Sequence, residues 1–375
     1  MRKSLPGRKI VAIGTLVALL AATTAAPALA TGGATQQALD QVVADGVPGA
    51  EAAVTDHRHT TVTRSGTGDL ATGKPFPRNG SFRPGSVTKT FVATVVLQLV
   101  AEGKIRLDAP IERYLPGLIA GNGNDGTKIT VRQLLQHTSG LYNYTSDFAG
   151  VDPETLRHRG AVPEELVAMA MKHAPLFAPG TKWSYSNTNY IVAGMLVEKV
   201  TGQQLGDEIA RRITRPLGLR GTSLPGHGDE RLPAPHAVGY TPIGGKLVDF
   251  SDLDATIAWA GGGLVTTPAE LNTFFGALLG GRLLPAAQLA EMRHGVPAGE
   301  INVPGAVYGL GLASFPLPCG GEFSGHGGSI NGFSTLSGIA TGGRTATVVT
   351  NLYPMPGTAM TDQVTALETA LCSGK

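Results

Sequence analysis

The sequence predicts an α/β protein in which one sheet is built from both ends of the chain, with a mostly helical region inserted between them. Strand-like runs occur only near the two ends, at 50–55, 60–64, 307–312, 333–339 and 345–352. The stretch from about 104 to 255 instead has helical patterns and loops. We therefore expect a sheet domain from 34–85 and 257–373, and a helical lobe from 86–256. A cleft between the two is a usual place for a site.

The composition predicts a folded chain with a large core. Of 375 residues, 42% are hydrophobic and only 15% are charged, whereas disordered chains combine high charge with few apolar residues. The 30 basic residues nearly balance the 28 acidic ones, and the sequence has no basic run. We therefore expect no nucleic-acid partner. Two cysteines are too few for a cysteine zinc cluster.

The first thirty residues have the pattern of a secretory signal peptide. Four basic residues precede an apolar stretch at 10–22, and Ala28–Ala30 supplies the small residues of a cleavage site. The apolar stretch is shorter than the roughly 20 residues of a membrane span, although an anchor that stays attached is the alternative. Cleavage after Ala30 would leave a net charge of −2, because the removed piece holds four basic residues and no acidic one. We expect a secreted protein without a stable membrane anchor.

The N-terminal elements follow from local patterns. A helix is expected at 35–45, and strands at 50–55 and 60–64 are separated by a polar turn. The next helix runs from Ser86 to Glu102 and is followed by Gly103, a C-cap residue. Between Phe91 and Ala101 only two residues are polar, and a helix that is apolar nearly all round is normally buried. The start of this helix should therefore lie at the centre of the fold.

The later elements complete the predicted order. Further helices are expected at 131–136 after a Thr130 cap, and at 163–173, 190–200, 205–213, 268–279 and 358–371. The stretch Gly121–Gly126 matches Gly-x-Gly-x-x-Gly, but it neither follows a strand nor opens a helix, so we interpret it as a surface turn. The sequence has no Gly-x-Ser-x-Gly, His-Glu-x-x-His or P-loop motif. We predict no cofactor and no metal.

Ser86 and Lys89 are the first candidate pair. Three residues apart at the start of a helix, they lie on the same face, one turn apart. The positive end of the helix dipole favours a developing anion at Ser86. Burial lowers the pKa of an amine, and a neutral lysine beside a serine can accept the hydroxyl proton. The alternative is a serine helix cap with a solvated lysine.

Tyr185 and Asn187 form a second motif, Tyr-x-Asn. A phenol whose pKa is lowered by a nearby lysine can relay a proton to a leaving group. An amide two residues further on offers a donor and an acceptor to a substrate or to the lysine. The alternative is a loop tyrosine, with Asn187 capping the next helix.

His326 and Gly328 form a third motif, His-x-Gly, before the strand expected at 333–339. An imidazole beside the nucleophile can act as a cation or as a hydrogen-bonding group. Gly328 would let a bound backbone approach closely. The alternative is a histidine in a glycine-rich turn. His158 heads a second match in a charged loop, which we discard.

Together and in this order, the three motifs resemble those of the penicillin-recognising serine hydrolases. Within that family the chain is most similar to the secreted serine-type D-alanyl-D-alanine carboxypeptidases and their class C β-lactamase relatives. The resemblance covers nearly all of the chain after residue 30, and includes the stretches Arg83–Lys89, His137–Leu141 and Tyr185–Tyr190. It implies an antiparallel sheet flanked by helices, with an inserted helical lobe.

The resemblance also implies roles. Ser86 would be the acylated nucleophile, Lys89 its base, and Tyr185 the group that handles the leaving-group proton. Asn187 would hold the substrate amide, and His326 would replace a lysine found in related enzymes. The remaining implied substrate-binding positions are Gly328, Ser329 and Trp259. The backbone N–H groups of Ser86 and Ser329 would form the oxyanion hole, and Trp259 would line the cleft unless it belongs to the core between the lobes.

The two cysteines, Cys319 and Cys372, have the spacing of a pair that is bonded in the carboxypeptidases that the chain resembles. Export alone permits such a disulfide, with two free buried thiols as the alternative. One departure concerns the substrate. The closest carboxypeptidases carry an arginine before the first cysteine, whereas the stretch Leu312–Pro318, around Ala313, has no basic residue.

These observations lead to three functional hypotheses. The first is a D-alanyl-D-alanine carboxypeptidase that cleaves cell-wall peptides and is acylated by β-lactams. The second keeps the same site for esters, D-amino-acid amides or β-lactams, and the missing basic residue motivates it. The third is a non-catalytic ligand-binding sensor. The expected partners are a small peptide or ester substrate and β-lactams as acylating ligands.

Overall fold

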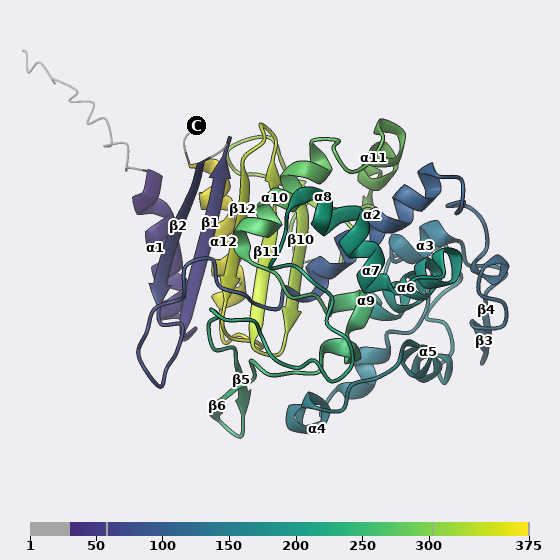
Figure 1. The fold of residues 1–375 in the computed structure, drawn as a ribbon, viewed down its shortest axis with the longest axis horizontal. Coiled ribbons are helices and arrows are strands. Elements are labelled where there is room, and N and C mark those ends of the chain that lie inside the picture. Colours follow the sequence, from purple (N-terminus) through teal and green to yellow (C-terminus); the bar gives the residue numbers. More distant parts are fainter. Residues whose placement is uncertain (1–30, 58, 302, 374–375) are drawn as a thin grey trace, which may run out of the picture.

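The computed structural model describes residues 31–57, 59–301 and 303–373. Its centre is an eight-stranded sheet in the order β2-β1-β12-β11-β10-β9-β8-β7, and its neighbouring strands are antiparallel. The strands of this sheet are β1 (Gly49–Asp56), β2 (His59–Gly66), β7 (Val296–Pro297), β8 (Val307–Tyr308), β9 (Ala313–Pro316), β10 (Glu322–Ile330), β11 (Phe333–Ala340) and β12 (Thr345–Thr350). Helices flank the sheet, which confirms the predicted α/β class (Figure 1).

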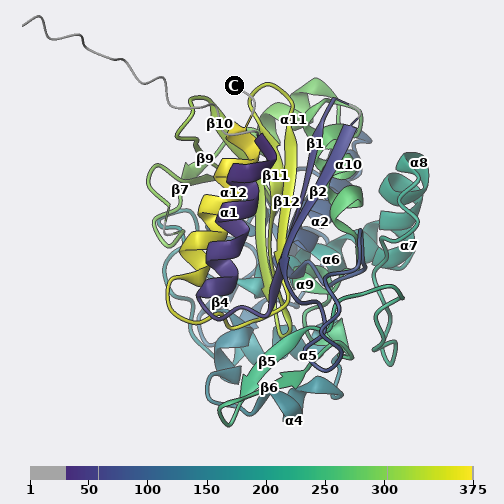
Figure 2. The same ribbon diagram turned by 90° about the vertical axis from the view of Figure 1, so that its left-hand side faces the viewer.

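Two helices cover one face of the sheet. They are α1 (Thr31–Ala44) and α12 (Ala359–Cys372), which lie side by side against the strands (Figure 2). Their apolar residues form a core with the facing sides of β1 and β12, including Leu39, Ala50, Val348 and Leu367. Helix α10 (Pro268–Leu279) lies on the opposite face. The sheet is thus a central layer between helices.

Strands from the two ends of the chain pair within one sheet, as the sequence predicts. Strand β1 pairs with β2 on one side and with β12 on the other, and Ala53 lies opposite Thr347. The hairpin of β1 and β2 therefore depends on the C-terminal strands for its inner neighbour.

The remaining helices gather beside the sheet. They are α2 (Thr88–Ala101), α3 (Val131–Leu135), α4 (Pro153–Arg157), α5 (Pro163–Met171), α6 (Asn187–Thr201), α7 (Leu205–Ile209), α8 (Arg215–Leu217), α9 (Trp259–Gly262) and α11 (Ala286–Arg293). Two short hairpins accompany them, β3 (Ala120–Gly121) with β4 (Asn124–Asp125), and β5 (Tyr240–Ile243) with β6 (Lys246–Asp249). Helix α2 is buried along nearly its whole length, as its apolar pattern predicts. Thr130 caps α3 through a capping box with Gln133.

Two differences from the predicted secondary structure lie next to each other near the candidate site. The sequence predicted no strand at β10, which instead runs through His326 and Gly328 between β9 and β11. Conversely, the strand expected at 307–312 stops after Tyr308. A turn follows at once, in which the N–H of Gly309 donates to the carbonyl oxygen of Leu312 at 2.8 Å, and Gly311 inside this turn has a φ of +72°.

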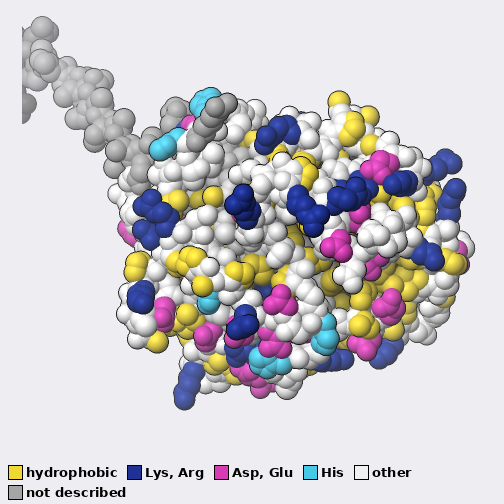
Figure 3. All heavy atoms as spheres, in the orientation of Figure 1, with side chains coloured by type: hydrophobic (Ala, Val, Ile, Leu, Met, Phe, Trp, Pro, Cys, Tyr) yellow, Lys and Arg dark blue, Asp and Glu magenta, His cyan; other side chains and the backbone are white. Residues whose placement is uncertain are grey.

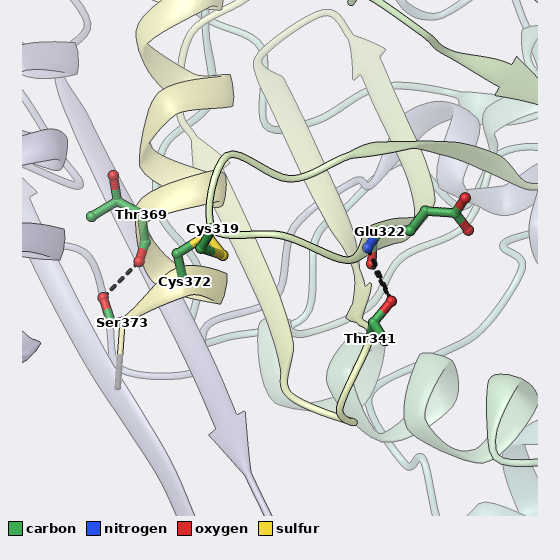
Figure 4. The surroundings of a disulfide bond; sticks show 6 residues. All are labelled: Cys319, Glu322, Thr341, Thr369, Cys372 and Ser373. Atoms are coloured by element: carbon green, nitrogen blue, oxygen red, sulfur yellow. Dashed lines mark hydrogen bonds between the residues drawn. A yellow bond between two sulfur atoms is a disulfide. The ribbon is translucent and has the colours of Figure 1, made fainter. Parts of the chain in front are cut away.

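A disulfide joins Cys319 to Cys372 and ties the loop before β10 to the end of α12 (Figure 4). Close by, the backbone N–H of Glu322 donates to Thr341 Oγ1 at 2.9 Å, which links β10 to the turn after β11.

In the described residues no helix is both long enough and apolar enough to cross a membrane. The predicted signal peptide, residues 1–30, lies outside the described residues. On the surface in Figure 3, basic and acidic side chains are interspersed.

Candidate active site

Ser86 lies in a short 3₁₀ helix, Gly85–Val87 (η1), that leads directly into α2. One turn later, the side chain of Lys89 is completely buried. Its Nζ lies 3.0 Å from Ser86 Oγ. The predicted spacing therefore places a hydroxyl and an amine in hydrogen-bond contact, and the alternative of a solvated lysine does not apply.

The other contacts of Lys89 define how its amine is oriented. Nζ donates to Asn187 Oδ1 at 2.7 Å and to the carbonyl oxygen of Gly261. Both groups are acceptors only, so a neutral amine would use its two hydrogens on them and turn its lone pair to Ser86 Oγ. Desolvation by burial holds the pKa of Lys89 well below its ordinary value. This geometry suits a lysine that accepts the serine proton.

Asn187 is the first residue of α6, and the structure gives it a bridging position. Its backbone N–H bonds Asn143 Oδ1 at 3.0 Å, and its Nδ2 donates to Thr145 Oγ1 at 3.2 Å. Ser186, not Asn187, occupies the N-cap of α6. The alternative of a capping asparagine is therefore wrong.

Tyr185 lies on the other side of the lysine. The ring centroid is 4.9 Å from Lys89 Nζ, and the hydroxyl forms a hydrogen bond with Ser86. Burial raises the pKa of Tyr185, and the bond with Ser86 lowers it only in part. We expected a lowered pKa, so this expectation was wrong. Desolvation outweighs the hydrogen bond, and the phenol stays protonated at neutral pH, ready to donate a proton.

Glycines bring the β10 strand against the nucleophile. A Cβ added to Gly328 would lie 1.9 Å from the carbonyl oxygen of Pro84 and 2.8 Å from the backbone nitrogen of Ser86. Gly85, with φ +53°, also packs against backbone, since an added Cβ would lie 2.7 Å from the nitrogen of Ser329. The backbone that approaches Gly328 in the structure is that of the protein's own serine turn. The close approach of a bound substrate backbone to this strand stays a prediction.

His326 lies on the same strand, two residues before Gly328. Its Nε2 is 2.8 Å from the hydroxyl of Tyr308, and its Nδ1 bonds the carbonyl oxygen of Gly327. Burial, together with the charge of Lys89, lowers the pKa of His326 to about 3. His326 is therefore neutral at physiological pH and acts as a hydrogen-bonding group, the second of the two possibilities that we considered.

A cavity of about 610 Å³ opens beside Ser86. Its polar lining includes Ser86, Asn187 and Ser329. Most of the remaining wall is apolar and comes from Phe148, Val151, Leu156, Phe250, Leu253, Ile257, Ile330 and Pro354. Among the described residues that line it there is no Lys, Arg, His, Asp or Glu.

Trp259 is not among the residues that line this cavity. It packs onto α6 instead, where a Cβ added to Gly194 would lie 2.8 Å from the indole ring. This position favours the alternative of a core tryptophan over a cleft tryptophan. A larger cavity of about 900 Å³ lies elsewhere, between α10 and the sheet, and contains none of the predicted site residues.

Sequence reasoning missed four participants, Asn143, Thr145, Gly261 and Tyr308. Asn143 and Thr145 follow the stretch His137–Leu141 and could have been sought there. Gly261 contributes only its carbonyl oxygen, for which a sequence offers no signal. Tyr308 lay in a run that was interpreted only as a strand.

Comparison with known proteins agrees with this geometry. The family model "Beta-lactamase" matches residues 35–370. A D-stereospecific amidohydrolase from Streptomyces sp. has 44% sequence identity and a TM-score of 0.82, over 90% of this chain and 98% of that one. A D-amino acid amidase from Ochrobactrum anthropi SV3 has 29% identity and a TM-score of 0.80, over 91% of this chain and 97% of that one.

Esterase EstB from Burkholderia gladioli is 36% identical over 202 residues, which are 51% of this chain and 50% of the esterase. The chain thus spans only half the length of that curated relative. The family match, by contrast, extends from α1 to α12 and includes every element that carries a candidate catalytic residue. The chain belongs to the beta-lactamase family and has its serine hydrolase fold.

Proposed function

We propose that the protein hydrolyses amides and esters of D-amino acids with apolar side chains, through an acyl-enzyme on Ser86. The cavity beside Ser86 carries this proposal. Its wall is mostly apolar, and its described lining has no charged side chain. Such a wall suits an uncharged group, because a charge that leaves water without a partner costs several kcal/mol.

The region around Ala313 supports the same choice. In the carboxypeptidases that the sequence resembles, a basic residue before the first cysteine binds the terminal carboxylate of the substrate. Here Ala313 is buried in a small apolar cluster with Tyr308 and Ala298. A charge-assisted contact to a carboxylate is worth roughly 1.5–3 kcal/mol, and this cluster offers none. Strict specificity for a D-Ala-D-Ala terminus is therefore the weaker of our first two hypotheses.

The similar proteins point the same way. The Streptomyces protein is described as a D-stereospecific amidohydrolase, the Ochrobactrum protein as a D-amino acid amidase, and EstB as an esterase. All three descriptions name hydrolysis at an acyl carbon. A serine acyl-enzyme accounts for amides and esters alike, because both pass through the same ester of the serine.

The proposed reaction has two halves. In the first, Lys89 accepts the proton of Ser86 Oγ while that oxygen bonds the substrate carbonyl carbon. The backbone N–H groups of Ser86 and Ser329 stabilise the oxyanion. The bond to the leaving amine or alcohol then breaks as Tyr185 gives it a proton, and the protonated Lys89 returns a proton to Tyr185, so that both groups regain their starting state. In the second half, a water gives a proton to the neutral Lys89 and bonds the acyl carbon, and that proton passes to Ser86 Oγ as the bond to the acid breaks.

A substrate panel tests the proposal. We expect D-phenylalanine amide and a short-chain nitrophenyl ester to be hydrolysed, with kcat/KM for L-phenylalanine amide and for a D-Ala-D-Ala tripeptide lower by about 100-fold or more. Faster cleavage of the tripeptide than of the amide would overturn the proposal in favour of the carboxypeptidase. Rapid turnover of a chromogenic cephalosporin alone would instead indicate a β-lactamase. If none of the substrates is turned over, the protein would be a ligand-binding sensor.

Mass spectrometry tests the nucleophile separately. β-Lactams acylate the nucleophilic serine of the penicillin-recognising hydrolases that the sequence resembles. We therefore expect penicillin to add its mass to a peptide that contains Ser86. Ser86→Ala should abolish the adduct, and Ser81→Ala, in the strand-like segment before the site, should leave it unchanged. An adduct that survives in Ser86→Ala would exclude Ser86 as the nucleophile.

We also propose that residues 1–30 are removed during export, and that 34–85 with 257–373 and 86–256 are the two domains. The disulfide supports export, because such bonds persist in oxidising compartments. N-terminal sequencing of protein from a culture supernatant should give Thr31 as the first residue.

A further inference from the structure

His137 lies between α3 and the site, and nothing in the proposed reaction uses it. Its side chain is completely buried, and its φ of +60° is in the left-handed region that few non-glycine residues adopt. The ring is 4.3 Å from the ring of Tyr185, measured between centroids. A buried histidine in a strained backbone next to a candidate catalytic residue calls for a physical explanation.

Hydrogen bonds define which ring nitrogen of His137 carries the proton. Nδ1 lies 3.2 Å from the backbone nitrogen of Ser186 and 3.1 Å from Asn189 Nδ2. The amide of Asn189 is oriented by Ser139, whose hydroxyl donates to Asn189 Oδ1 at 2.5 Å. Both groups at Nδ1 are therefore donors, so Nδ1 is the acceptor and the proton is on Nε2.

His137 also holds the chain on both sides of Tyr185. The backbone N–H of Ser184 donates to the carbonyl oxygen of His137 at 3.1 Å. The N–H of Ser186 donates to the ring of the same residue. The residues before and after Tyr185 are thus fixed to one buried side chain and its own backbone.

The second ring nitrogen has no such role. Among the described residues Nε2 has no hydrogen-bond partner. The rings near it are those of Tyr185, Tyr190, Tyr308 and Trp183, with centroids 4.3 to 5.9 Å from that of the imidazole. A phenylalanine would suit this environment equally well, so the apolar surroundings do not explain why a histidine is present. The hydrogen-bond acceptor at Nδ1 explains it.

We propose that His137 is the positioning residue for Tyr185, and that its Nδ1 acts as a fixed acceptor that aims the phenol at the leaving group. The inference rests on the proposed role of Tyr185 in amide hydrolysis. Burial, with the nearby Lys89 and His326, keeps the pKa of His137 well below its ordinary value. The ring therefore stays neutral, and its acceptor persists across the physiological pH range.

The first test reads the tautomer in the unmodified protein. Nitrogen NMR of histidine-labelled protein should show an unprotonated Nδ1 and a protonated Nε2 for His137 from about pH 5 to 9. A protonated Nδ1 in that range would overturn the proposal. This measurement needs no substrate, so it stays informative even if the proposed activity is wrong.

The second test separates an acceptor from a space-filling role. Asparagine tolerates a positive φ and can place an oxygen near the position of Nδ1, whereas phenylalanine keeps a ring without an acceptor. We expect His137→Phe to lower kcat for D-phenylalanine amide by about 10- to 100-fold, and His137→Asn to stay within about 5-fold of the parent. His294→Phe is the matched control, because His294 follows the last residue of α11 and its side chain is exposed.

The leaving group provides a third readout. A nitrophenolate departs without a proton, so misplacing Tyr185 should affect ester hydrolysis much less than amide hydrolysis. We expect the amide-to-ester ratio of kcat to fall by about 10-fold in His137→Phe. Equal losses on both substrates, or equal losses in the Phe and Asn variants, would show a merely structural role.

One further variant guards against misfolding of His137→Phe. In Asn189→Asp a carboxylate replaces the amide that donates to Nδ1, and it should draw the imidazole proton to that nitrogen. The N–H of Ser186 then loses its acceptor although His137 is still present. The same amide-selective loss is expected, and an unchanged ratio of amide to ester hydrolysis would contradict the proposal.

Discussion

At the scale of single residues, the site depends on a lysine that is buried without a carboxylate among its hydrogen-bond partners. Lys89 bonds a hydroxyl, an amide oxygen and a backbone carbonyl. Burial lowers its pKa, so a neutral amine is accessible near physiological pH. The pKa of Lys89 therefore determines both how strong a base the amine is and how the acylation rate depends on pH.

This gives the first prediction. The rate of acylation should fall as the pH drops through the pKa of Lys89, because the protonated amine cannot accept the proton of Ser86. Lys89→Arg, which stays charged at every accessible pH, should lower acylation by about 1,000-fold or more. Single-turnover kinetics with a nitrophenyl ester measure both. An arginine variant with near-parental acylation would exclude Lys89 as the base.

The second prediction concerns Glu51, a buried carboxyl group on β1. Burial raises its pKa to about 7, with Arg64 opposing. Unfolded protein ionises this group near its ordinary pKa, so the folded state loses stability as the pH rises from about 4.5 to 7. The cost above that range is up to about 3 kcal/mol, because one pKa unit corresponds to about 1.4 kcal/mol.

Glu51→Gln removes the ionisation and should stabilise the protein at pH 8 but hardly at pH 4. Urea unfolding at the two pH values measures the difference. The exposed Glu165→Gln on α5 is the control and should be neutral at both. Equal stability of the parent and Glu51→Gln at pH 8 would mean that Glu51 ionises normally in the folded protein.

Local spacing explains which site residues were predictable. Ser86 with Lys89 and Tyr185 with Asn187 are each close in sequence, so helix geometry or a short motif brings them together. The carbonyl oxygen of Gly261 comes from a distant segment and is a backbone group, and backbone groups carry no sequence signature. His137 was visible only as part of a resemblance, and its role follows from contacts that only the fold provides.

At the scale of elements, the contact between η1 and β10 places the nucleophile. Gly328 is the closest point, since its added Cβ would lie 1.9 Å from the carbonyl oxygen of Pro84. A Cβ added to Gly327, one residue earlier on the same strand, would lie 3.1 Å from the end of the Leu336 side chain, and the nearest backbone atom, the oxygen of Thr335, is 3.8 Å away. Two neighbouring glycines thus differ in whether backbone or a flexible side chain blocks a methyl group.

The third prediction uses this pair. Gly328→Ala must push the serine turn away from β10, and a displacement of about 1 Å at reacting atoms costs about 100-fold in rate. Gly327→Ala should stay within about 3-fold of the parent, because the leucine can move. The measurement is kcat/KM for the ester, with circular dichroism to check folding. Similar rates for the two variants would argue against the contact as a positioning device.

The same strand explains the main error in predicting elements. Strand β10 contains Gly325, Gly327 and Gly328, and glycine is depleted in strands because it adds no packing and costs entropy. Its pairing with β9 and β11, together with the close approach of η1, compensates for that weakness. Such compensation is tertiary, so a propensity argument could not detect it. Helix α10 was predicted at its observed bounds because its signals are local, namely the Thr267 cap and the apolar face.

At the scale of the whole molecule, the site forms where strand β10, from the C-terminal part of the chain, meets the inserted helices α2 and α6. Strands β1, β2, β11 and β12 were predictable from their patterns, but their order in the sheet was not, because it depends on long-range pairing. The bond between Cys319 and Cys372 adds a covalent link across this arrangement. It joins the loop before β10 to α12, on the sheet face opposite α10.

The fourth prediction concerns this link. The cysteines are 53 positions apart, and cross-linking a loop of that size restricts the unfolded chain by an amount worth about 4 kcal/mol. Replacing both cysteines by serine should lower the free energy of unfolding by about that amount and Tm by about 5 °C. Strand β10 keeps its pairing on both sides without the bond, so kcat/KM at 25 °C should change less than about 2-fold. Calorimetry and ester kinetics on the same preparations separate the two effects. An unchanged Tm with reduced activity would contradict the prediction. The disulfide would then serve the geometry of the site, because the strand that carries Gly328 would need the covalent bond to keep its position against the serine turn.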